Sequence, residues 1–332
     1  MASVIVAAFA CALTAGAACA QDSAPWRDPS PHRARMVTVD EGVRLEVLDW
    51  GGLGRPLILL AGSGVTAHIY DDLAPGLTDR GHVYGVTRRG FGASTHPRSG
   101  YDDQRLAADV VAVIEALHLE RPVLVGHSAA GNEITTIGSR HPDIISGLVY
   151  LDGVFDPKDL PSDDAKARAL YDRMPAWVRG GEPPTTAESR TFEGYRAFQK
   201  RTTGFAFPGS ELRQLFATDA DGSRGRYLGS PDASRQMGEG QIRRDYSGIR
   251  APILALFAGE PLAHPPADPG EQEAIDAYHS AKLAFVERWK AQLRRATGPV
   301  RIVDLPAASH FMFLSNETET LREIRALVGS LR

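Results

Sequence analysis

A serine among very small residues is the first position whose type and spacing suggest chemistry. Ser128 lies in the stretch "VLVGHSAAGNEI", with Gly126 two residues before it and Ala130 two residues after it. A buried strand over 123–126 that leads directly into a helix over 129–140 would put this serine on a tight turn where only small neighbours fit. The pattern predicts an exposed serine nucleophile. The alternative is that Ser128 only caps the helix that follows.

Serine is a weak nucleophile and needs a base, for which histidine is the usual residue. Of the ten histidines, His310 in "LPAASHFMF" is the best placed, because it follows the last expected strand and precedes a C-terminal helix. His127, inside the serine turn, is interpreted as a structural or supporting residue. Three further histidines lie on expected loops that could border a site, and nothing in the sequence singles them out: His68, His96 and His264.

The elements that would position these side chains alternate along the chain. Short β-rich runs, several of them unbroken and apolar, are separated by amphipathic stretches such as 103–118. Apolar runs of this kind are typical of strands buried on both faces of a parallel sheet, so the order predicts an α/β fold with a largely parallel sheet. The expected strands are 36–39, 43–50, 56–61, 83–87, 122–126, 147–152, 252–258 and 300–305.

This alternation stops between the sixth and seventh expected strands, over residues 153–250. Helical patterns at 163–178, 188–201 and 210–219 are separated there by segments rich in Pro and Gly, such as "RGGEPP" and "DGSRGRYLGSPD". The segment predicts an inserted helical cap. Its aromatic residues either line an apolar pocket or form the core of the cap: Trp177, Phe192, Tyr195, Phe198, Phe205 and Phe207.

With these features together, the chain resembles the α/β-hydrolase superfamily over nearly all of residues 36–332. "GHSAAG" is similar to the G-x-S-x-G turn of that family, with Ala130 in place of the last glycine, and "RRGFGAS" (88–94) is similar to its glycine-rich turn after strand four. The resemblance implies an eight-stranded, mostly parallel sheet and the chain order serine, acid, histidine, which favours His310 as the base. Serine rather than aspartate at the turn favours an acyl-enzyme, and therefore hydrolysis of a hydrophobic ester, lactone or amide.

The same resemblance implies an oxyanion hole made of backbone N–H groups. One donor would be Ala129, the residue after the nucleophile. The other would lie in "LLAGSGVTA", where Ser63 is favoured and Gly64 is the alternative. A phosphate-binding loop is excluded because no G-x-x-x-x-G-K-[ST] pattern is present.

Two carboxylates could complete a triad. Most members of the family carry the acid after strand seven, where this chain has Glu260, and a smaller group carries it after strand six, where it has Asp152. We favour Asp152, since only Gly153 follows it and a short side chain there can point inward. Glu260 is followed by a Pro-rich loop, and it stays open as the alternative.

Composition limits the other classes of function. The 332 residues, 43% apolar and 23% charged, suit one large domain or a domain with an inserted lobe. The net charge of −4 is spread along the chain without a basic stretch, so we expect no binding to nucleic acid. We expect no cofactor and no metal, and a small molecule as the partner. The sequence does not indicate an oligomeric state.

The first twenty residues lack charged side chains and end in the A-x-A pattern Ala18-Cys19-Ala20. They predict a signal peptide over 1–20, a Pro-rich leader over 21–35, and an exported protein, periplasmic or secreted, with no integral membrane segment after cleavage. Cleavage would remove both cysteines, which excludes a cysteine nucleophile and zinc–cysteine sites. Lipidation of Cys19 is a weaker alternative, because Gly16 lies where a lipobox has leucine.

The expected organisation is therefore a hydrolase core over 36–152 and 251–332 that carries the cap over 153–250. Two rival functions stay open. One is an acyltransferase or a peroxidase-like enzyme that uses the same triad, and the other is a non-catalytic ligand-binding protein of this fold.

Overall fold

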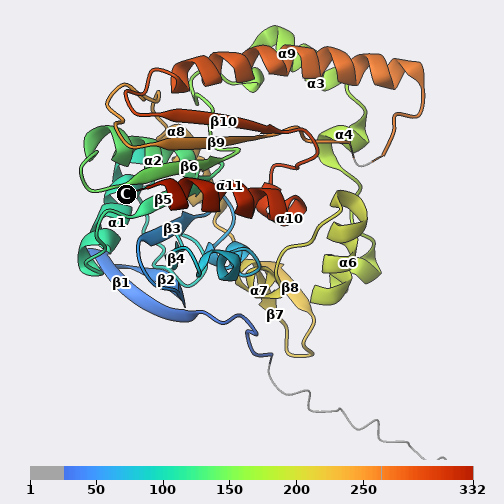
Figure 1. Cartoon of the computed structure of the whole chain (residues 1–332). Helices are drawn as coiled ribbons and strands as arrows, with labels where there is room; N and C mark the ends of the chain where they lie inside the picture. The colour runs from blue at the N-terminus through green and yellow to red at the C-terminus, as the bar shows by residue number, and fades with distance from the viewer. Residues whose placement is uncertain (1–25, 263, 332) are drawn as a thin grey trace, which may run out of the picture.

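Eight strands form one continuous sheet in the computed structural model, which describes residues 26–262 and 264–331 (Figure 1). Their order across the sheet is β1-β2-β4-β3-β5-β6-β9-β10. The predicted α/β fold and all eight expected strands are confirmed, while the predicted signal peptide lies outside the described residues. The strands are β1 (Arg33–Asp40), β2 (Val43–Gly51), β3 (Pro56–Leu60), β4 (His82–Val86), β5 (Val123–His127), β6 (Gly147–Leu151), β9 (Ile253–Ala258) and β10 (Val300–Leu305).

The sheet is mostly parallel and is covered on both faces. β2 pairs antiparallel with β1 and β4, and the remaining neighbours are parallel. Alternate side chains of each strand enter different cores: Ile58 and Leu60 pack with one set of helices, Leu57 and Leu59 with the other. The first set is α1 (Asp103–Ala116), α2 (Ala130–Arg140) and α9 (Pro269–Leu293). The second is the short helices η1 (Ala67–Tyr70) and η2 (Ala74–Leu77) with α10 (Met312–Ser315) and α11 (Glu317–Ser330).

The predicted helical insert lies between β6 and β9 and is confirmed. Pro175 divides the expected helix over 163–178 into two, because proline cannot donate the backbone hydrogen bond that a helix interior needs. The helices of the insert are η3 (Pro161–Asp163), α3 (Ala165–Arg173), α4 (Ala176–Gly180), α5 (Thr186–Arg190), α6 (Phe192–Thr203), α7 (Gly209–Leu215) and α8 (Pro231–Glu239).

One part of the insert differs from the expectation. The helix expected over 210–219 ends at Leu215, and a small antiparallel hairpin follows, β7 (Phe216–Thr218) and β8 (Arg224–Tyr227). Aromatic packing explains the hairpin, since the ring of Phe216 lies 5.5 Å from that of Tyr227 and 5.4 Å from that of Tyr195. The Arg224 guanidinium covers the same ring at 4.2 Å.

The boundaries of the insert and leader are less sharp than the sequence indicated. β1 begins at Arg33, so it takes in the last residues of the expected leader. After α8 the chain returns to the core, where Tyr246 and Ile249 are buried. Arg244 donates to the side chain of Asn132 and to the carbonyl of Gly153, which fixes this returning segment beside α2.

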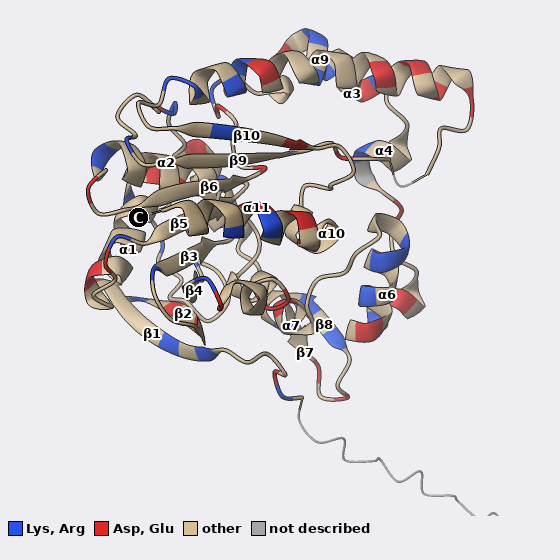
Figure 2. Ribbon diagram, in the orientation of Figure 1, with Lys and Arg blue, Asp and Glu red and all other residues tan. Residues whose placement is uncertain are grey.

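Charged residues of both signs are interspersed along α6 and α9 in the view of Figure 2. This mixing is consistent with the small net charge of the chain. None of the described helices is both long enough and apolar enough to cross a membrane.

Candidate active site

The turn between β5 and α2 has the geometry that the small residues around Ser128 indicated. The strand ends at His127, the helix begins at Ala130, and Ser128 between them has a φ of +52°. A Cβ atom added to Gly126 would lie 3.0 Å from the carbonyl oxygen of Ala130, and one added to Gly131 would lie 2.0 Å from that of Gly153. The approach at Gly131 excludes any side chain, the approach at Gly126 is tight, and Ser128 stays half-exposed between the two glycines.

His310 and Asp152 are in direct contact. Asp152 follows β6, the strand next to β5, and its Oδ2 lies 2.7 Å from Nδ1 of His310. Its other oxygen accepts a hydrogen bond of 3.1 Å from the N–H of Ala258, which fixes the plane of the carboxylate. The imidazole is 38% exposed and the carboxylate 19%, so the ring meets solvent while the acid behind it is largely covered.

Glu260, the other candidate acid, has a different partner. Its carboxylate forms an ion pair with Lys282 of α9 and is 41% exposed. An oxygen of Glu260 lies within 4.8 Å of the facing polar atoms of Asp152 and His310, but among the described residues only Asp152 hydrogen-bonds to Nδ1 of His310. The structure therefore brings both carboxylates to the histidine and joins one of them to it.

Three neighbouring strands end in the same unusual way. Ser128 after β5, Asp152 after β6 and Glu260 after β9 have φ values of +52°, +43° and +50°. Non-glycine residues rarely adopt this left-handed conformation, which costs about 1–2 kcal/mol each. The N–H of Ser128 donates to Leu151 O at 3.1 Å and that of Asp152 to Leu256 O at 2.9 Å, each on the neighbouring strand, while that of Glu260 donates to Ala308 O at 2.9 Å in the loop after β10.

The loop after β3 lies against the Ser128 turn. A Cβ atom on Gly62 would lie 2.9 Å from Nδ1 of His127 and 3.1 Å from Cβ of Ser128, so a larger residue would displace one of these side chains. The N–H groups of Ser63, Gly64 and Ala129, the residues expected to be oxyanion donors, form no hydrogen bond with any described residue. These donors stay available beside the serine.

A buried arginine holds this loop from the opposite side. Arg88 donates to the carbonyl oxygens of Ala61 at 2.9 Å and Gly62 at 3.1 Å, and its Nε donates to Glu133 at 2.7 Å. Because C=O and N–H point in opposite directions across a trans peptide, turning the Gly62 carbonyl toward Arg88 turns the Ser63 N–H away from it. The resemblance identified "RRGFGAS" only as a glycine-rich turn and assigned no role to its arginines. The sequence feature that could have indicated this contact is the pair of adjacent arginines directly after a buried strand.

His127 supports the loop that carries His310. Its ring is buried, and Nε2 lies 3.0 Å from the carbonyl oxygen of His310. Burial holds the pKa of His127 well below its usual value, so the neutral ring donates its Nε2–H to that carbonyl. Its centroid lies 4.6 Å from the His310 ring and 4.9 Å from that of Phe311. The expected supporting role of His127 thus has a specific contact.

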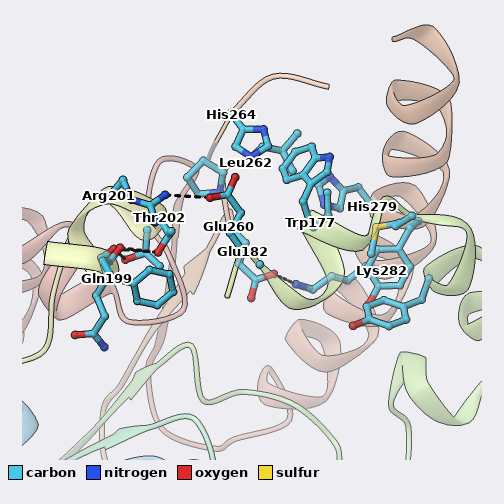
Figure 3. Close-up of a pocket in the computed structure, with 18 of the residues that line it drawn as sticks. Trp177, Glu182, Gln199, Arg201, Thr202, Glu260, Leu262, His264, His279 and Lys282 are labelled. Carbon is cyan, nitrogen blue, oxygen red and sulfur yellow. Dashed lines mark hydrogen bonds and ion pairs between the residues drawn. The ribbon is translucent and has the colours of Figure 1, made fainter. Parts of the chain in front are cut away.

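A cavity of about 620 Å³ opens between the insert and the loop after β9 (Figure 3). Trp177, Tyr195 and Phe198 line it, and so does Glu260, which connects the cavity wall with the His310 region. The walls also carry the ion pairs Arg201–Glu182 and Lys282–Glu260, so the lining is more polar than expected.

The other aromatic residues expected in the cap lie elsewhere. Phe192 is buried inside the insert, where the Arg213 guanidinium covers its ring at 4.0 Å. Phe205 and Phe207 pack on Phe311, the residue after His310, with ring centroids 6.1 and 5.0 Å away. They connect the insert to the histidine loop.

Residues 57–323 match the model of the Alpha/beta hydrolase family, and the chain belongs to that family. It is 36% identical over 264 residues to a non-heme haloperoxidase from Rhodococcus erythropolis, a match that covers 75% of this chain and 89% of the relative. A crystal structure of E-2-(acetamidomethylene)succinate hydrolase is similar, with a TM-score of 0.62 and 22% identity over 90% of this chain and all of that one. Some other matches are shorter. The chain spans 44% of a putative carbamate hydrolase from Caulobacter segnis at 36% identity over 119 residues, or 35% of this chain.

Proposed function

We propose that this protein is a serine hydrolase that cleaves a carboxylic ester, lactone or amide of a small molecule through an acyl-enzyme on Ser128. The observation that carries the proposal is the 2.7 Å contact between His310 Nδ1 and Asp152 Oδ2, on the loop and strand that flank the Ser128 turn. A carboxylate on Nδ1 leaves Nε2 as the basic atom, which is the arrangement that activates a serine hydroxyl.

The proposed reaction has two halves. The Ser128 oxygen attacks the substrate carbonyl while His310 Nε2 accepts its proton, and the N–H groups of Ala129 and Ser63, or Gly64 as the alternative, stabilise the oxyanion. The protonated His310 then donates to the leaving alcohol or amine. In the second half, His310 removes a proton from water, the hydroxide attacks the acyl group, and the acid and free Ser128 are released.

The cavity suggests the class of substrate. Ser128 and His310 do not line the cavity, which reaches their region through Glu260, and we propose that it holds the part of the substrate away from the bond that is cleaved. The cavity volume of about 620 Å³ suits a small molecule, and the cavity wall combines aromatic rings with two ion pairs. We therefore propose a substrate with an aromatic or apolar part and at least one polar substituent, rather than a long unsubstituted chain. A panel of esters, lactones and amides that differ in these two properties tests this preference.

A peroxidase-like reaction is a second candidate, which the similarity to the Rhodococcus haloperoxidase favours. In this reaction hydrogen peroxide replaces water in the second half, attacks the acyl group and leaves as a peracid. Product analysis with and without peroxide distinguishes the two, because only the second reaction forms a peracid. In both cases a fluorophosphonate probe labels Ser128. A folded chain that takes up no label is instead a ligand-binding protein.

The contact between Arg88 and the oxyanion loop leads to a testable prediction. Arg88→Lys keeps the charge, but one ammonium cannot reach both carbonyls and Glu133, so we expect kcat to fall by about 10²-fold, as when one oxyanion donor is lost. Arg89→Lys is the matched control, since Arg89 is equally buried and pairs with Asp109 at 2.6 and 2.7 Å without touching the loop.

Both variants weaken a buried ion pair, so comparable losses in Tm are expected from calorimetry. Only Arg88→Lys is expected to lose kcat at a temperature where both are folded. Equal kcat in the two variants would count against the role of Arg88 in orienting Ser63.

We also propose that the protein is exported after cleavage between Ala20 and Gln21. Support comes from the uncharged apolar run and the A-x-A pattern at its end. Mass spectrometry of the mature N-terminus tests this proposal. A lipidated Cys19 or an intact Met1 in the cytoplasm would overturn it.

A further inference from the structure

Four side chains from two distant parts of the sequence converge on the side of the sheet that carries η1. Asp28 and His32 come from the leader, and His68 and Asp71 come from η1 and the residue that ends it. One nitrogen or oxygen of each lies within 4.8 Å of one from every other. The spacings Asp-x₃-His and His-x₂-Asp place two such atoms on each segment.

Three of the distances between these atoms are close to those between the ligands of a tetrahedral metal site. His68 Nδ1 lies 3.4 Å from Asp71 Oδ2 and 3.5 Å from Asp28 Oδ2, and His32 Nε2 lies 3.7 Å from Asp28 Oδ2. Ligands bound about 2.0–2.1 Å from a tetrahedral Zn²⁺ lie about 3.3–3.4 Å from one another. The observed separations are near this value and exceed those of ordinary hydrogen bonds.

His68 Nδ1 is the atom that most needs a partner. The side chain is 5% exposed, and Nδ1 has no hydrogen-bond partner among the described residues. A buried ring nitrogen without a partner is costly. Nδ1 of His68 faces the carboxylates of Asp28 and Asp71 at distances that suit a shared cation. The buried donor set itself therefore points to a bound cation.

Each histidine of the cluster also has a carboxylate at its other ring nitrogen: Glu46, outside the cluster, for His68, and Asp71, within it, for His32. Nε2 of His68 faces Glu46 Oε1 at 3.5 Å, and Glu46 is held in turn by the Thr87 hydroxyl at 2.8 Å. Nδ1 of His32 lies 2.9 Å from Asp71 Oδ1. Each imidazole thus has one nitrogen facing the cluster and the other facing a carboxylate, the arrangement that fixes the tautomer of histidine ligands.

We propose that Asp28, His32, His68 and Asp71 bind one divalent transition-metal ion, with Zn²⁺ the best match. Two imidazole nitrogens and two carboxylate oxygens are a donor set that zinc accepts. Asp28 is 26% exposed while the other three side chains are at most 7% exposed, so the leader closes the site from outside.

The ion would act as a structural tie and would take no part in the proposed hydrolysis. None of the four residues belongs to the Ser128 region. Asp71 also accepts a hydrogen bond from Ser210 at the start of α7, and the neighbouring Glu211 accepts one of 2.9 Å from the N–H of Thr66. The ion would therefore join the leader, η1 and the base of the insert.

The alternative is that no metal ion binds and that a proton on His68 balances the negative charge of the cluster. Burial lowers the pKa of His68, but the facing carboxylates of Asp71 and Glu46 outweigh it and raise the pKa to about 10. A protonated His68 would then take the place of the metal among the carboxylates. The experiment must therefore distinguish a bound metal ion from a protonated His68.

The test uses the full chain, treated with EDTA, dialysed and titrated with Zn²⁺, with Co²⁺ as a spectroscopic substitute. We expect one Zn²⁺ per chain by elemental analysis, a rise of several degrees in Tm on metal addition, and visible Co²⁺ absorption typical of tetrahedral sites. Asp28→Asn, on the exposed side, should weaken Zn²⁺ binding at least tenfold and remove the Tm response.

His68→Gln should abolish binding, and His82→Gln is the matched control. His82 lies 2.7 Å from Asp49 in a histidine–carboxylate pair outside the cluster, so this variant should bind metal like the parent. A Tm that neither Zn²⁺ nor EDTA changes would overturn the proposal in favour of protons. So would equal Zn²⁺ binding by Asp28→Asn and the parent. Because the catalytic residues are separate, Ser128 labelling is unaffected by either result.

Discussion

Ser128→Ala is expected to lower kcat by a factor on the order of 10⁶ with little change in Tm or circular dichroism. The hydroxyl is the proposed nucleophile, and no other oxygen replaces it. The fold should tolerate the change because alanine keeps the Cβ atom, so the strain at φ +52° is neither added nor relieved. Steady-state kinetics on the best ester, together with thermal unfolding, measure both quantities.

Ser63→Ala is the control for this prediction. Ser63 is an exposed serine on the loop beside Ser128, and its proposed contribution is the backbone N–H, which alanine keeps. We expect this variant to stay near the parent in kcat and to be labelled normally by a fluorophosphonate. More than about one per cent residual activity in Ser128→Ala would rule out the nucleophile assignment.

Asp152→Asn should lower kcat about 10³–10⁴-fold, because an amide donates to His310 Nδ1 and leaves the ring in the wrong tautomer. Glu260→Gln should stay within about tenfold of the parent, since Glu260 pairs with Lys282 rather than with the histidine. The two variants make the same chemical change at equivalent ends of neighbouring strands, so each is a control for the other.

Thermal unfolding should accompany these assays, because Asp152 Oδ1 also accepts the N–H of Ala258. The asparagine oxygen can keep that bond, so a loss of kcat without a large loss of Tm is expected. The opposite ranking of the two variants would assign the acid to Glu260 and leave the proposed roles of Ser128 and His310 unchanged.

The strands were predictable because each is a short β-rich run, and several are continuous apolar runs. The Ser128 turn could be found because small residues, Gly126 and Ala130, lie two positions to either side of the serine, and the backbone at Gly126 is tightly packed. The contact between His310 and Asp152 was predictable only as a choice between two acids. Side-chain direction, not position along the strand, decides which carboxylate reaches the ring.

Other features depend on contacts between distant residues and were missed for that reason. The β7–β8 hairpin depends on aromatic packing between Phe216 and Tyr227, which overrides the helical pattern before it. A different reason applies to the long helix α9. Few of its side chains are buried, so its sequence shows only a weak apolar stripe. Arg88 lies 26 positions from Gly62, and His68 lies 40 positions from Asp28 (68 − 28), separations at which spacing alone gives little information.

The three strained strand ends have a consequence for protein engineering. Glycine would relieve the left-handed strain at residues 128, 152 and 260, and a library screened for heat resistance alone would reward that replacement. At 128 and 152 the same replacement would delete the proposed nucleophile and its acid. Directed evolution of this scaffold therefore needs a selection for turnover at every round, since heat tolerance and catalysis favour opposite residues at these positions.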